Sequence, residues 1–135
     1  MPSRSPGRRG SLRPTPASAC QAARTASIAS FFTRHDVWLT PTLAGPPLPI
    51  GHFSSQPATA EAWAKGFTDY CPFTYPFNVT GQPAASLPLF WTEAGLPIGC
   101  QIAGRSGDEA TLVRLSAQLE RARPWFARRP PGSRR

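Results

Sequence analysis

The sequence predicts an α/β fold in which a short strand and a β-hairpin are packed by a C-terminal helix, between disordered basic tails. Three observations lead to this prediction. Val37–Thr40 is a short β-branched and aromatic run that a proline closes. Residues 84–103 alternate in polarity on either side of Gly95. Leucines then recur at helical spacing from Leu112 to Leu119.

The first 23 residues are rich in Arg, Ser and Pro and contain almost no large apolar side chains. Such a segment buries too little surface to offset its ordering entropy, so it is predicted to be disordered. Its composition also describes an organelle transit peptide, but its prolines oppose the amphipathic helix that such a peptide needs. Order is predicted to begin near Arg24, in the last turns of a helix with Ile28, Phe31 and Phe32 on one face.

The run Val37–Thr40, ended by Pro41, is predicted to be a buried strand. The prolines that follow predict an irregular, extended connection through Gly51. A short helix is then predicted around Ala58–Tyr70. The aromatic residues spaced to share one face of it are Trp63, Phe67 and Tyr70.

Ala84–Phe90 and Pro97–Ala103 are predicted to form the hairpin, with Gly95 as the left-handed residue of its turn. A capping box at Ser106–Glu109 predicts the start of the C-terminal helix, and Pro124 ends it. The predicted organisation has three parts: a disordered segment over 1–23, an ordered unit over 24–126 and a disordered basic tail over 127–135.

The net charge of +8 comes from the two ends of the chain. Residues 1–24 contain five Arg and residues 121–135 contain six, with no acid in either, whereas residues 25–120 contain four basic and seven acidic side chains. A nucleic-acid-binding domain carries its basic stripe on the folded surface, often with aromatic residues between the charges. No specific nucleic-acid partner is therefore predicted, although the ends attract polyanions non-specifically.

Several common chemistries lack their sequence signals. The three cysteines form no CxxC pair and the two histidines have no ligand partners at useful spacing, so no disulfide or metal site is predicted. No apolar run approaches the ~20 residues of a membrane span, and no secretory signal is present. These observations predict a cytoplasmic protein that does not associate with membranes.

No catalytic residue is predicted within the chain. A hydrolase needs a nucleophile with a base in reach, yet no serine lies in a GxSxG or SxxK pattern. The single lysine, Lys65, lies on the predicted amphipathic helix, far from any glycine-rich serine loop. Asp108 and Glu109 are explained by their capping role.

Two stretches, DVWLTPTLAGPPLPIG and FTYPFNVTGQPAASLPLFWTEAGLPIGCQIAG, resemble the C-terminal end of the amidase signature family. The resemblance runs continuously from about residue 24 to residue 131. It implies hydrolysis of carboxylic amide C–N bonds without a cofactor, on a mixed, mostly parallel sheet wrapped by helices. The family's catalytic serine, second serine and lysine have no matching positions here. The chain is therefore expected to be a C-terminal amidase fragment that is inactive alone.

In this family the segment completes the sheet and closes one wall of the pocket for a small-molecule amide. The wall positions that the resemblance implies are Thr40, Pro41, Phe73, Phe77 and Asn78. Each also has a plain structural interpretation, as a strand end, a core aromatic or a turn residue. The family's glutamine-dependent branch has an Asp where this chain has Cys71, so a general amidase fits better.

Two alternatives belong to other classes of protein. The first alternative is a non-enzymatic module that docks on another chain, one that carries the catalytic half. The exposed apolar edge of an incomplete sheet would favour such docking. The other alternative is a small basic nucleic-acid-binding protein, which rests on the arginine-rich ends alone.

Overall fold

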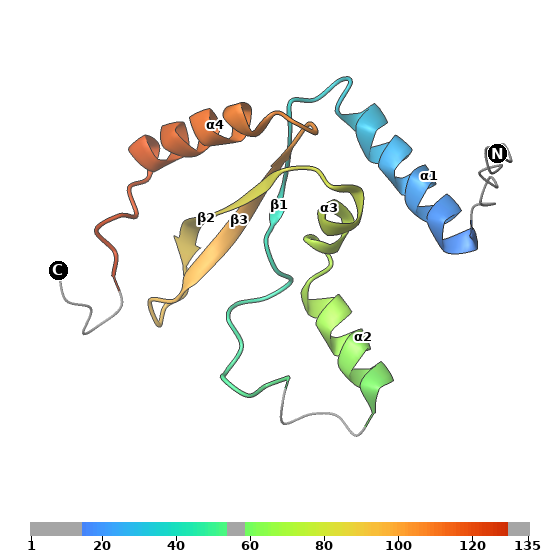
Figure 1. The fold of residues 1–135 in the computed structure, drawn as a ribbon. Helices are drawn as coiled ribbons and strands as arrows, with labels where there is room; N and C mark the ends of the chain where they lie inside the picture. Colours follow the sequence, from blue (N-terminus) through green and yellow to red (C-terminus); the bar gives the residue numbers. More distant parts are fainter. Residues whose placement is uncertain (1–14, 54–58, 130–135) are drawn as a thin grey trace, which may run out of the picture.

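The computed structural model describes residues 15–53 and 59–129. The elements follow one another as α1 (Pro16–Phe31), β1 (Val37–Pro41), α2 (Ala60–Tyr70), α3 (Tyr75–Thr80), β2 (Ala84–Trp91), β3 (Pro97–Gly104) and α4 (Glu109–Ala122) (Figure 1). The strands form one sheet in the order β1-β3-β2, with both pairs antiparallel. The predicted strand, hairpin and C-terminal helix are confirmed. The three described strands pair only in antiparallel fashion, whereas the sheet implied for the family is mostly parallel.

The central strand β3 fixes the register of the sheet. Gln101 pairs with Thr40 on β1 and with Ser86 on β2, so these three side chains share one face. The register shifts between Leu87 and Phe90, where β2 contains Pro88. A proline is tolerated there because β2 is an edge strand and the ladder is already interrupted.

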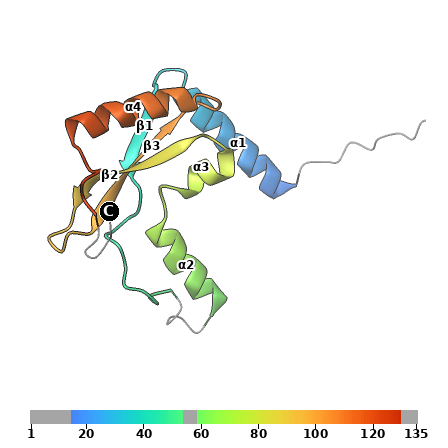
Figure 2. The same ribbon diagram turned by 60° about the vertical axis from the view of Figure 1, so that its left-hand side comes forward.

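Helices pack on both faces of the sheet and build two apolar clusters (Figures 1 and 2). The cluster under α4 consists of Leu87, Ile102 and Leu112. The cluster on the opposite face joins α1, α3 and β3 and consists of Ile28, Phe32, Phe77 and Ala103. The predicted apolar faces of the first and last helices are therefore confirmed.

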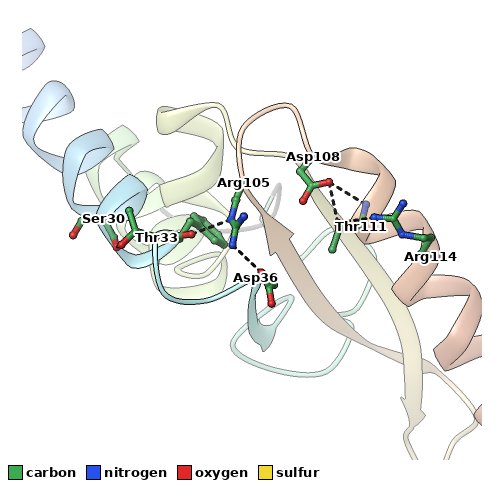
Figure 3. Close-up of polar contacts among 8 residues, drawn as sticks. Ser30, Thr33, Asp36, Arg105, Asp108, Thr111 and Arg114 are labelled. Carbon is green, nitrogen blue, oxygen red and sulfur yellow. Dashed lines mark hydrogen bonds and ion pairs between the residues drawn. The ribbon is translucent and has the colours of Figure 1, made fainter.

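Arg105, directly after β3, ties the end of α1 to the sheet (Figure 3). Its Nε donates to the Phe32 carbonyl at 2.9 Å, and its Nη2 donates to the Asp36 carboxylate at 2.8 Å. Because Phe32 caps the C-terminal end of α1, the guanidinium also lies where the helix dipole favours positive charge.

The first helix extends further toward the N-terminus than the sequence predicts. α1 begins at Pro16, so residues 16–23, predicted to be disordered, are helical. A proline fits the first helical position because its missing N–H has no partner there, and Thr15 Oγ1 accepts from the Ser18 N–H at 3.2 Å. The disorder predicted for residues 1–14 and 130–135 lies outside the described residues.

Three further expectations need correction. β1 is an edge strand rather than a buried one, and Leu39 on it is 67% exposed. The N-cap of α4 is Asp108 instead of Ser106, because the Asp108 carboxylate accepts from the backbone and hydroxyl of Thr111 at 3.4 and 2.9 Å (Figure 3). The corner around Asn78, predicted to be a turn, is the short helix α3, which ends at Gly81 with φ 79°.

Helix α2 carries the aromatic face that the sequence predicts. The rings of Trp63, Phe67 and Tyr70 each contact the ring of Phe53. Among the residues that the structure describes, no helix has the length and apolarity required to cross a bilayer. Residues 15–53 and 59–129 also contain no cluster of side chains suited to hold a metal ion.

Candidate functional site

The α1-facing side of the sheet changes from apolar to polar along β3. Its polar part centres on Gln101, which is 4% exposed and is the one buried polar side chain among the described residues. Gln101 Nε2 donates to the Phe73 carbonyl at 2.9 Å and to Thr40 Oγ1 at 3.3 Å. One amide thereby joins the end of β1, the centre of β3 and the loop that precedes α3.

A pair of hydroxyl groups lies next to this amide on the same face. Thr42 Oγ1 and Ser86 Oγ are 2.6 Å apart, and the Thr42 N–H donates to the Gly99 carbonyl at 2.9 Å. A Cβ at Gly99 would lie 2.5 Å from Ser86 Oγ and 2.6 Å from Thr42 Oγ1. Because Gly99 has no Cβ, the two hydroxyl groups can occupy this space.

A pocket of about 260 Å³ adjoins the hydroxyl pair. Prolines and aliphatic side chains make up most of its lining: Thr42, Leu43, Gly45, Pro47, Ser86, Pro88, Pro97, Ile98 and Gly99. Small-molecule sites typically combine such an apolar lining with a few polar groups that fix orientation. This arrangement suits a small ligand with an apolar body and a hydrogen-bonding group.

The structure brings together two of the five wall residues that the resemblance implies. Thr40 and Phe73 both accept from Gln101, and Pro41 is exposed at the end of β1. Phe77 is buried, with its ring 5.7 Å from that of Trp38, and Asn78 is exposed on α3. None of the five lines the pocket beside Thr42, as the structure describes it.

The sequence does not identify Gln101, Thr42 or Ser86 as site residues. One available signal is the position of Gln101 between Cys100 and Ile102 in an otherwise apolar strand. A polar side chain at such a position, on a face covered by helices, needs buried hydrogen-bond partners. The partners themselves are not visible in the local pattern, because they lie on other elements.

The described residues do not assemble a nucleophile with a base. Lys65 lies on α2 with its side chain 76% exposed, and its Nζ donates to Asp69 at 2.6 Å. Within residues 15–53 and 59–129, no hydrogen bond joins this lysine to a serine. Burial raises the pKa of the Cys100 thiol above its ordinary 9.0, and Arg123 lowers this pKa by a smaller amount. The raised pKa disfavours the reactive thiolate.

Comparison with known proteins identifies the family to which this architecture belongs. The profile of the amidase family matches residues 15–113, and the chain belongs to this family. It is 50% identical over 70 residues to a 6-aminohexanoate-cyclic-dimer hydrolase of Paenarthrobacter ureafaciens, and 34% identical over 104 residues to an acylamidase of Rhodococcus erythropolis. A solved 6-aminohexanoate cyclic dimer hydrolase matches 87% of the chain with 34% identity and a TM-score of 0.74.

The chain is much shorter than these relatives. The alignments cover 52% of this chain and 14% of the Paenarthrobacter enzyme, and 77% of this chain and 22% of the Rhodococcus acylamidase. The structural match spans 26% of the solved hydrolase. The chain therefore corresponds to only a part of an amidase, and the resemblance seen in its sequence is confirmed.

Proposed function

We propose that this chain completes the sheet and one wall of the substrate pocket of an amidase that acts on small-molecule amides, and that it does not hydrolyse amides alone. The observation that carries this proposal is the pair of hydrogen bonds from Gln101 to Thr40 and Phe73. They fix the loop before α3 to the sheet face on which the Thr42 pocket lies.

Within this proposal the wall has a polar and an apolar function. The Thr42 and Ser86 hydroxyls donate to and accept from the amide group of a substrate, while Pro88 and Ile98 contact its apolar part. The wall positions implied by the family resemblance extend this surface: Thr40, Pro41, Phe73, Phe77 and Asn78. Phe77 supports this wall from the apolar core, since its ring packs edge-on against Trp38.

Catalysis is assigned to residues outside this chain, because Lys65 is paired with Asp69 on an exposed helix. Purified chain incubated with 4-nitroacetanilide is expected to release no more 4-nitroaniline than buffer does. Turnover that disappears on Lys65→Ala, in a variant whose thermal melt is unchanged, would overturn the inactive-alone part of the proposal.

A second candidate, docking on a separate chain that carries the catalytic half, is favoured by one observation. Among the strands that the structure describes, β1 pairs with β3 alone, and Leu39 on it is 67% exposed, so this edge presents apolar surface and backbone groups that an incoming chain could pair with. Light scattering of this chain mixed with the remaining part of the 6-aminohexanoate-cyclic-dimer hydrolase tests it. A 1:1 complex supports docking, and two separate monomers contradict it.

We also propose a cytoplasmic location. Cys20, Cys71 and Cys100 are free thiols, which persist in a reducing compartment. Fractionation of the source cells with detection of residues 105–123 tests this, and recovery outside the cytoplasmic fraction would contradict it.

A further inference from the structure

The segment that follows α4 returns to the tip of the β2–β3 hairpin (Figure 2). Along it, three arginines lie over aromatic rings. The guanidinium-to-ring distances are 4.9 Å for Arg123 over Phe90, 4.9 Å for Arg128 over Trp91 and 5.2 Å for Arg129 over Phe126. Stacking of this kind holds a guanidinium in place by cation–π attraction.

A pocket of about 570 Å³ lies between the hairpin tip and this returning segment. Trp91, Leu96 and Pro97 contribute apolar surface from the hairpin, while Arg128 and Arg129 contribute from the segment. It is separate from the pocket beside Thr42, with which it shares only Pro97. The pocket thus combines an apolar lining with two cations.

The two arginines have no anionic partner in the part of the chain that the structure describes. The ion pairs found there are Lys65–Asp69 and Arg105–Asp36. The Arg128 backbone N–H donates to the Trp125 carbonyl at 2.9 Å, which anchors the segment without using the guanidinium. A guanidinium stacked on a ring keeps its N–H edges available, and its planar fork matches a carboxylate or a phosphate.

We propose that this pocket binds an amphiphilic organic anion. The apolar body of the ligand lies against Trp91, Leu96 and Pro97, and its carboxylate or phosphate head accepts hydrogen bonds from Arg128 and Arg129. Stacking of Arg128 on Trp91 reduces the ordering entropy lost on binding, as preorganised sites do. The inference is independent of the proposed amidase function, because its pocket shares only Pro97 with the pocket beside Thr42 and includes neither Gln101 nor its hydrogen-bond partners.

Isothermal titration calorimetry of the full chain with octanoate and with octyl phosphate tests the proposal. Acetate and inorganic phosphate supply the two head groups without an apolar body. At least one amphiphile is expected to bind about tenfold or more tightly than its isolated head group. The stronger of the two amphiphiles identifies the head group that the site prefers.

The variant Arg128→Gln/Arg129→Gln is expected to weaken that binding by about tenfold or more, because charged hydrogen bonds are lost. Its matched control is Arg114→Gln/Arg121→Gln, which removes two charges from α4 outside the pocket and is expected to change affinity less than twofold. Ala127→Phe keeps both arginines but fills the pocket, and is expected to abolish binding. If the double Gln variant does not melt cooperatively, binding to the Ala127→Phe protein tests the proposal in its place.

Three results would overturn the proposal. The first is that neither amphiphile binds. This result would overturn the proposal even if an oligothymidylate, a single-stranded nucleic acid added as a further probe, does bind. The second is equal loss of affinity in the two double variants, which would mean attraction to net charge alone. The third is unchanged binding in a folded Ala127→Phe protein.

Discussion

The side-chain amide of Gln101 donates to the backbone carbonyl of Phe73 across 2.9 Å, which joins the centre of β3 to the loop before α3. The same nitrogen reaches Thr40 Oγ1 at 3.3 Å. A buried amide with two partners on two other elements fixes the relative position of all three. This contact connects the stability of the fold to the shape of the proposed pocket wall.

Replacing Gln101 by Leu is expected to lower the free energy of unfolding by about 1–3 kcal/mol, because the Phe73 carbonyl and Thr40 hydroxyl lose their donor. Urea denaturation measures this loss. Gln118→Leu on the exposed face of α4 is the matched control, with an expected change within about 0.5 kcal/mol. Equal effects of the two substitutions would remove the special role of Gln101.

Gly99→Ala is expected to destabilise the protein by about 1–3 kcal/mol, because its Cβ would overlap the Thr42 and Ser86 hydroxyls. Gly66→Ala is the control, since nothing lies within 4 Å of a Cβ built there. In the middle of α2 it is expected to stabilise by up to about 1 kcal/mol. Thermal melts of both variants check the prediction, and a stable Gly99→Ala protein would contradict the close packing at that position.

The two hydrogen bonds of Arg105 are expected to contribute unequally. Asp36→Asn should cost less than about 1 kcal/mol, because the Asp36 side chain is 81% exposed and water screens the pair. Arg105→Gln also removes the donor to the Phe32 carbonyl, so faster amide hydrogen exchange is expected in the last turn of α1. Exchange measured by mass spectrometry distinguishes the two variants, and identical exchange in both would contradict this account.

The pKa of Cys100 predicts a dependence of stability on alkaline pH. Burial raises this pKa above 9.0 in the folded protein, with a smaller lowering by Arg123. The thiol therefore contributes stability that is present below the unfolded pKa and is lost as the pH rises through the folded pKa. Alkylation of Cys100 in a Cys20→Ser/Cys71→Ser protein measures the shift. Equal alkylation midpoints in folded and urea-unfolded protein would contradict it.

The hairpin and α4 could be predicted because local signals specify them. Alternation on both sides of Gly95 places Leu87 and Ile102 on one face, and the structure buries both under α4. Leu112, at the start of the helical leucine pattern, packs in the same cluster. In these elements the neighbours in sequence are also the neighbours that determine the conformation.

Two segments whose sequences indicate disorder or a turn are helical in the structure. Residues 16–23 and the Tyr75–Thr80 segment have the composition of disorder and of a turn, yet both are helical. Pro16 and Pro76 lie in the first turn of their helices, where a missing N–H costs nothing. The position of each proline in the first turn, rather than its presence, decides whether the helix forms.

The candidate site could be predicted only in part. Thr40 and Phe73 are implied by the family resemblance, but the residue that joins them is Gln101, whose partners lie 61 and 28 positions away in the chain. Thr42 and Ser86 are likewise 44 positions apart. Such contacts depend on the pairing of β1 with β3 and on the placement of loops far away in the sequence, which no local pattern encodes.

The central claim, that this chain forms the pocket wall of an amidase, is tested most directly in a chimera. Residues 15–113 replace the matching segment of the 6-aminohexanoate-cyclic-dimer hydrolase, and hydrolysis of the cyclic dimer is measured with Gln101 intact and with Gln101→Leu. The account predicts turnover in the first chimera and a clear loss in kcat/KM in the second. A chimera that folds cooperatively but shows no turnover, or whose kcat/KM is unaffected by Gln101→Leu, would contradict it.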